Sequence, residues 1–178
     1  MKEHQTITSA QQGTLIHLCL QYLNEKEVYS KDKVEELIKR LVEEQKITKE
    51  EAKVINIQQI YEFTKSKIWS EITTAKEVYK EQPFYYFIPA KEIYNEEVEE
   101  NILVQGIIDL YYIDTNGNIT LVDYKTDHVK NEQEIIEKYK NQLEIYKKAL
   151  EESCGKKVKN VYIYSTYLNK EINIHSMK

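Results

Sequence analysis

The chain has 178 residues, which is enough for one domain with a substantial core. Hydrophobic residues make up 41% and charged residues 31% of it, a balance typical of globular folds and not of disorder. The formal net charge of −5 counts against autonomous tight binding to DNA, and the 2 cysteines are too few for a four-cysteine zinc or iron–sulfur site. We find no signal-peptide core and no run of membrane-spanning length, so we expect a cytoplasmic protein.

The first half of the chain is predicted to be helical, because apolar residues recur at helical spacing and neither Pro nor Gly occurs between residues 14 and 82. Helices are predicted over 11–24, over 33–45, from a capping box of Thr48 and Glu51, and from about Ile57 to about Trp69. We therefore expect a helical N-terminal part over about 11–76.

The second half is richer in aromatic and β-branched residues, which favour strands. A strand is predicted over 77–89, where Pro83 indicates an edge or a bulge, and the acidic stretch 91–101 is predicted to be a solvated loop. After two further strands come an amphipathic helix over 132–153, a strand over 157–168 and a short strand over 171–176. Helices followed by a β-β-β-α-β order predict an α+β or α/β fold with a mixed central sheet flanked by helices.

The two strands around the Asn-Gly turn carry charged residues inside apolar runs. With a two-residue loop, Asp109 would lie opposite Tyr124. With a three-residue loop that ends on a left-handed Gly117, Asp109 instead lies opposite Asp123. Lys125 then joins the same face, because side chains alternate along a strand.

Two adjacent carboxylates in a partly buried setting repel each other and lose hydration, so a hard divalent cation is the simplest compensating partner. A lysine beside them can neutralise the remaining charge, polarise a phosphate or orient a water. The set of Asp109, Asp123 and Lys125 therefore predicts metal-dependent attack on a phosphodiester. For Asp123 and Lys125 alone, the alternative is an ordinary ion pair at a strand end.

Several segments of the chain resemble motifs of the RecB-type nuclease branch of the PD-(D/E)xK superfamily. These segments are GTLIH at 13–17, KEQPF at 80–84, GIID at 106–109, DYKT at 123–126 and QLEIY at 142–146. Together they look most like the C-terminal nuclease domains of AddA-type helicase–nucleases. The resemblance covers nearly the whole chain, and it implies a single domain over 1–178 with a restriction-endonuclease-like core over about 77–178.

The resemblance also implies roles for individual residues. The implied catalytic residues are Asp109, Asp123, Lys125 and Glu81, with Lys125 positioning or activating the attacking water and Glu81 assisting beside the metal. The implied metal ligands are His17, Asp109, Asp123 and the backbone carbonyl of Tyr124. The implied supports of the site, which would also contact DNA, are Gln142 and Tyr146.

These assignments have simpler alternatives, each of which stays open at this point. His17 would otherwise be a core histidine, and Glu81 a solvent-facing charge on a strand. Gln142 and Tyr146 are four residues apart, so ordinary packing of one helix face is their alternative.

The implied cofactor is Mg²⁺, with Mn²⁺ as a substitute, and no iron–sulfur cluster is expected. The implied activity is that of a DNA exonuclease in double-strand-break end processing and recombinational repair, within a longer ATP-dependent helicase–nuclease. The implied partners are a single DNA strand delivered from a duplex end, the helicase portion of the parent chain and an AddB-like protein, with no membrane. The alternatives are a catalytically silent nuclease-fold module that binds DNA ends or a partner, and a stand-alone RecB-like exonuclease.

Overall fold

The computed structural model of the protein describes residues 7–91 and 100–174. Its first half contains the helices α1 (Ser9–Tyr22), α2 (Lys31–Glu43), α3 (Lys49–Val54), α4 (Ile57–Phe63) and α5 (Lys67–Ile72). Its second half contains β1 (Glu77–Pro89), β2 (Asn101–Ile113), β3 (Ile119–Lys125), α7 (Glu132–Cys154), β4 (Val158–Ser165) and β5 (Lys170–Asn173). The predicted order of helices followed by β-β-β-α-β is thus confirmed.

Polar side chains at the helix N-termini explain where these helices begin. Each of the five starts after a Ser, Thr or Asn whose side chain accepts a hydrogen bond from a backbone N–H of the first turn. The capping box of Thr48 and Glu51 is present as predicted.

Three predicted boundaries differ from the structure. The single helix predicted from Ile57 to Trp69 is two helices, because Ser66 donates to the carbonyl of Phe63 at 2.7 Å and caps α5. Asn101, placed in a solvated loop, already belongs to β2, and residues 92–99 of that stretch lie outside the described residues. The last strand ends at Asn173, and residues 175–176 are likewise outside the described range.

The sheet has five strands in the order β1-β2-β3-β4-β5. Only β3 and β4 are parallel, and the 23-residue helix α7 makes the crossover that a parallel pair requires. The predicted mixed sheet is therefore confirmed. β1, which contains Pro83, is an edge strand as the proline indicated.

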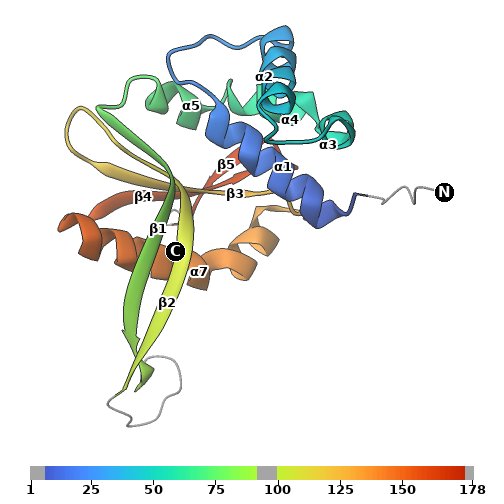
Figure 1. Cartoon of the computed structure of the whole chain (residues 1–178). Coiled ribbons are helices and arrows are strands. Elements are labelled where there is room, and N and C mark those ends of the chain that lie inside the picture. The colour runs from blue at the N-terminus through green and yellow to red at the C-terminus, as the bar shows by residue number, and fades with distance from the viewer. Residues whose placement is uncertain (1–6, 92–99, 175–178) are drawn as a thin grey trace.

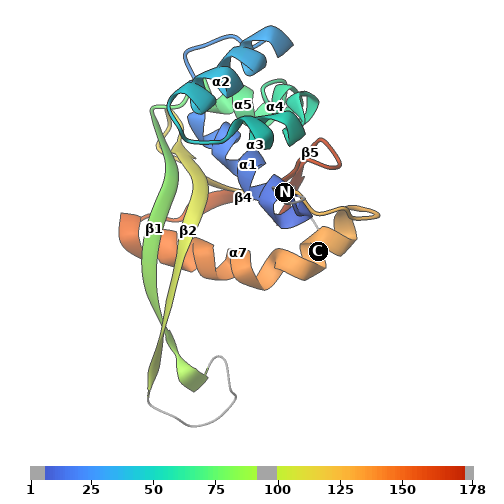
Figure 2. The same ribbon diagram turned by 45° about the vertical axis from the view of Figure 1, so that its right-hand side comes forward.

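Helices cover both faces of this sheet (Figure 1). The N-terminal helices lie on one face, where their buried side chains form a core with Leu110, Val122 and Tyr124. Helix α7 lies on the other face, where it packs on Ile119 and Leu121. Strands β1 and β2 continue past α7 as a two-stranded ribbon (Figure 2). The edges of these layers meet near the ends of β2 and β3, where the charged residues lie.

The register of the β2–β3 hairpin agrees with the three-residue loop. Asp114 N–H donates to the carbonyl of Asn118 at 3.0 Å, and Gly117 has a φ of +81°, in the left-handed region that glycine tolerates. The ladder runs to the pair of Leu110 with Val122. The next two residues, Asp109 and Asp123, therefore lie across from each other.

Candidate active site

The aspartates and the lysine of the hairpin meet just beyond the last pair of the β2–β3 ladder. Oδ2 of Asp109 accepts a hydrogen bond of 2.7 Å from the backbone N–H of Tyr124. Oδ2 of Asp123 lies 2.7 Å from Nζ of Lys125, and Asp123 is only 3% exposed. Although this ion pair is close, no described residue donates to Oδ2 of Asp123 with good hydrogen-bond geometry. A buried carboxylate with unused acceptor capacity suits a cation.

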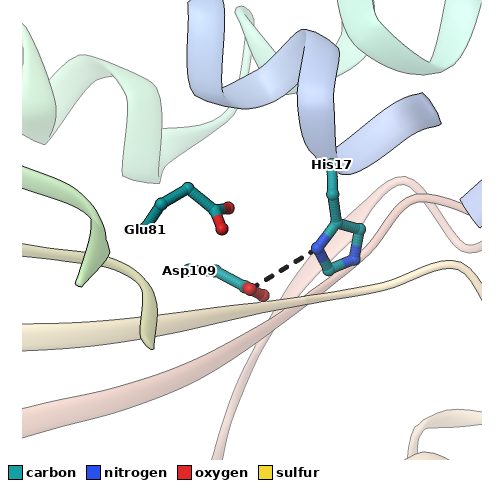
Figure 3. A group of neighbouring side chains, drawn as sticks. All are labelled: His17, Glu81 and Asp109. Carbon is teal, nitrogen blue, oxygen red and sulfur yellow. Dashed lines mark ion pairs between the residues drawn. The ribbon is translucent and has the colours of Figure 1, made fainter. Parts of the chain in front are cut away.

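His17, Glu81 and Asp109 form a second part of the site, in which helix α1 meets strands β1 and β2 (Figure 3). One ligand atom from each residue lies within 4.8 Å of the other two. Nδ1 of His17 is 3.4 Å from Oδ1 of Asp109. One imidazole and two carboxylates at this spacing can hold a divalent ion. Among the described residues, Asp123 is not part of this group and instead pairs with Lys125.

The backbone of Glu81 is unusual for a strand residue. Its φ is +50°, a region that costs a non-glycine residue free energy of about 1–3 kcal/mol. The ladder pairs on either side are Lys80 with Leu110 and Gln82 with Ile108, so Glu81 lies across from Asp109. The glutamate is therefore not the solvent-facing charge of a regular strand, and Figure 3 shows its carboxylate beside Asp109.

Lys125 is held by groups on α7 as well as by Asp123. Its Nζ donates to Oε1 of Gln142 at 3.0 Å, and Nε2 of Gln142 donates to the hydroxyl of Tyr146 at 3.2 Å. The same Nζ lies 4.1 Å from the centre of the Tyr139 ring. Gln142 and Tyr146 thus lie where the resemblance implied, and their contacts go beyond ordinary helix packing.

Sequence reasoning missed the contribution of Tyr139 and its neighbour Asp127. The hydroxyl of Tyr139 lies 2.9 Å from both carboxylate oxygens of Asp127, which also pairs with Lys138. Tyr139 was predicted only as part of the apolar stripe of the helix over 132–153. The position of Asp127, two residues after Lys125, was the available signal for this contact.

Two glycines allow the elements around the site to approach closely. A Cβ on Gly106 would lie 2.8 Å from Cε1 of Phe84 and 3.4 Å from the hydroxyl of Tyr146. A Cβ on Gly13 would lie 2.7 Å from Oγ1 of Thr126. Glycine therefore lets β2 approach Phe84 and lets α1 bring His17 to the sheet, which explains these positions in GIID and GTLIH.

Tyr124 separates the two faces of the site. Its ring is buried on the helical side, where it makes edge contacts with His17 and Phe63 at centroid distances of 5.7 Å and 5.3 Å. Its side chain thus lies on the face opposite to Lys125, which contacts α7. The predicted role of its backbone carbonyl as a metal ligand stays a prediction.

The charges of the site shift the pKa values of its members. Burial raises the pKa of Asp123 most, Lys125 lowers it and Asp109 raises it, for a net value of about 6. Burial would lower the pKa of His17, but the hydrogen bond and charge of Asp109, with Asp123 and Glu81, outweigh burial and raise it. Burial and the charge of Asp109 also raise the pKa of Glu81. Accumulated negative charge therefore makes this site bind protons, and a cation can replace those protons.

Two further features bear on the expectations from composition. Cys19 and Cys154 are both free. Within the described parts of the chain, no helix has the length and apolar character needed to cross a membrane.

Comparisons with known proteins agree with this architecture. A family model described as the PD-(D/E)XK nuclease superfamily matches residues 2–176. The chain is 38% identical over 179 residues to an ATP-dependent helicase/nuclease protein of the AddA type from Clostridium botulinum (strain Hall), in a match that covers 98% of this chain and 14% of that protein. It is also 38% identical over 169 residues to a protein of the same name from Clostridium kluyveri, in a match that covers 92% of this chain and 14% of that protein.

The chain thus spans about 14% of the length of these curated relatives. The family match extends over both the helical part and the strands that carry the acidic residues and the lysine. The nuclease resemblance drawn from the motifs is confirmed: the chain belongs to the PD-(D/E)XK nuclease superfamily.

Proposed function

We propose that the chain is a Mg²⁺-dependent DNA exonuclease domain, with Mn²⁺ as a substitute metal. The observation that carries this proposal is the convergence of Asp109, Asp123 and Lys125 from the hairpin with His17 and Glu81. A nuclease-fold module that no longer cuts would have no need to keep a buried carboxylate beside a lysine, since such an arrangement costs stability.

The donor set fits a hard divalent ion, because it offers carboxylate oxygens and one imidazole. His17, Asp109 and Asp123 would hold the ion, with the carbonyl of Tyr124 as a further ligand and Glu81 beside it. When bound, the ion would supply charge stabilisation and a more acidic water.

Lys125 would position the attacking water and stabilise negative charge that develops on the phosphate. Gln142 and Tyr139 contact its ammonium group independently of Asp123. The lysine therefore stays in place when Asp123 binds a cation in exchange for the ion pair. Tyr146 supports this arrangement through its hydrogen bond with Gln142.

We further propose that the domain works within a longer cytoplasmic helicase–nuclease during double-strand-break end processing. The names of the relatives, of which this chain matches 14%, support a helicase context. The net charge of −5 supports delivery of the strand by other parts of such an assembly, since an acidic chain does not attract DNA over distance. An AddB-like protein is the proposed partner for that delivery.

A cleavage assay on end-labelled single-stranded DNA tests the activity. We expect shortening of the labelled strand with Mg²⁺, none with EDTA, and none with the Asp109→Asn variant. Asp114→Asn serves as the matched control, because Asp114 lies in the turn of the same hairpin and bonds only to loop residues. Intact DNA in all reactions, with a folded protein that still binds DNA ends, would favour the silent module.

A further inference from the structure

A second and larger pocket adjoins the candidate active site, and none of the proposed catalytic residues lines it. Its volume is about 720 Å³, against about 390 Å³ for the pocket that contains His17, Glu81 and Lys125. This volume lies within the range of pockets that bind small organic groups. A catalytic centre for phosphodiesters must also hold the nucleosides on either side of the phosphate, so the adjoining space requires an explanation.

The two pockets are continuous. Both are lined by Ala10, Gly13, Thr126 and Asp127. Thr126 directly follows Lys125 in the chain, so the larger pocket begins one residue beyond the lysine. A group bound there would be joined to a phosphate in the active site by a short covalent link.

The lining of the larger pocket is polar but contains no lysine or arginine among the described residues. Amide side chains of Gln12, Asn56 and Gln59 provide hydrogen-bond donors and acceptors. Its charged residue Asp127 is already paired with Lys138 and Tyr139. Neutral amides suit the base and sugar of a nucleotide better than its phosphate, which prefers cationic groups.

An aromatic pair stands beside this pocket. His128, which lines it, stacks on Tyr167 with ring centroids 4.5 Å apart and planes 26° apart. Tyr167 is 47% exposed. Exposed stacked rings next to a polar pocket offer a surface on which an unpaired base can stack.

We propose that this pocket binds the base and sugar of the unpaired nucleotide adjacent to the scissile phosphate, with the His128–Tyr167 pair as its stacking surface. The inference rests on the proposed nuclease function and specifies its substrate as a strand with unpaired bases. A base that is still paired in a duplex cannot enter the pocket, so strand separation precedes each cut.

The test is digestion of an end-labelled strand that contains one abasic residue. Wild type should pause at a phosphodiester on one side of the abasic residue, where cleavage slows by about tenfold, because one base–aromatic stack is worth about 1–3 kcal/mol. Tyr167→Ala should cut normal DNA about tenfold more slowly at low substrate and show no pause. Tyr85→Ala, which removes another exposed tyrosine, should behave as wild type.

A binding measurement separates this inference from the nuclease proposal. Fluorescence anisotropy in EDTA should show weaker binding of an abasic strand than of a normal strand, and Tyr167→Ala should lose that difference. If the protein discriminates in this way but never cuts, the nuclease proposal fails and the pocket assignment stands. If wild type passes the abasic residue without a pause, or if Tyr167→Ala retains both pause and discrimination, the pocket assignment is overturned.

Discussion

Replacing Asp123 with asparagine should stabilise the metal-free protein at neutral and alkaline pH. Burial raises the pKa of this carboxyl from an ordinary value of 3.8 to about 6, so folding favours its protonated form. Its contribution to stability is fully present below about pH 4 and is lost as pH rises through about 6. The shift of roughly two pKa units corresponds to about 3 kcal/mol at pH 8.

Asparagine mimics the protonated carboxyl at every pH, so Asp123→Asn should avoid this loss. In EDTA at pH 8, its melting temperature should exceed that of wild type by about 6–12 °C, at about 2–4 °C for each kcal/mol in a chain of this size. At pH 4 the two should melt together. Thermal melts followed by circular dichroism between pH 4 and pH 8 measure the difference.

Asp114→Asn is a control of opposite sign from the same hairpin. Hydrogen bonds from the side chain and backbone of Asn118 lower the pKa of Asp114, so this ionised carboxylate stabilises the fold at higher pH. Its replacement should lower stability at pH 8 and have less effect as pH falls through the lowered pKa. Wild type and Asp123→Asn profiles that coincide at all pH values would refute the destabilising burial of Asp123.

Three further predictions concern the surroundings of the site. Gly106→Ala should destabilise the fold by about 1–3 kcal/mol in urea unfolding and slow cleavage, because the added methyl would displace Phe84 and the Tyr146 hydroxyl; unchanged stability would contradict this packing. Tyr139→Leu should slow single-turnover cleavage by up to about thirtyfold at unchanged DNA affinity, whereas Tyr61→Leu, which removes a similar lysine–tyrosine contact elsewhere, should not. Mg²⁺ binding should release more protons at pH 6 than at pH 8, since the pKa values of two proposed ligands are raised; calorimetry in buffers of different ionisation enthalpy measures this, and equal release would argue against displacement.

The hairpin was the part of the site most accessible to prediction. Its register follows from the left-handed turn at Gly117, and strand alternation then places Lys125 on the face of Asp123. These are local rules, because every residue involved lies within one hairpin. The helix starts were predictable for the same reason, as the capping box at Thr48 shows.

Other features depend on contacts between distant segments, and sequence patterns do not report these. The positive φ of Glu81 is adopted across from Asp109, on another strand. Tyr139 fits the apolar stripe of its helix, but its ring covers Lys125 because α7 packs across the end of β3. Ser66 divides a predicted helix because its hydroxyl bonds to the backbone, in competition with helix continuation.

Cleavage by Lys125→Met under single-turnover conditions is the most direct test of the central claim. Methionine keeps much of the length of the lysine side chain and removes its charge. With Mg²⁺ saturation established separately by its effect on melting temperature, the variant should bind metal and DNA as wild type does but cut at least about a hundredfold more slowly, as expected for a group acting in the transition state. Cleavage at the wild-type rate by a variant that binds metal normally would contradict a catalytic role for Lys125.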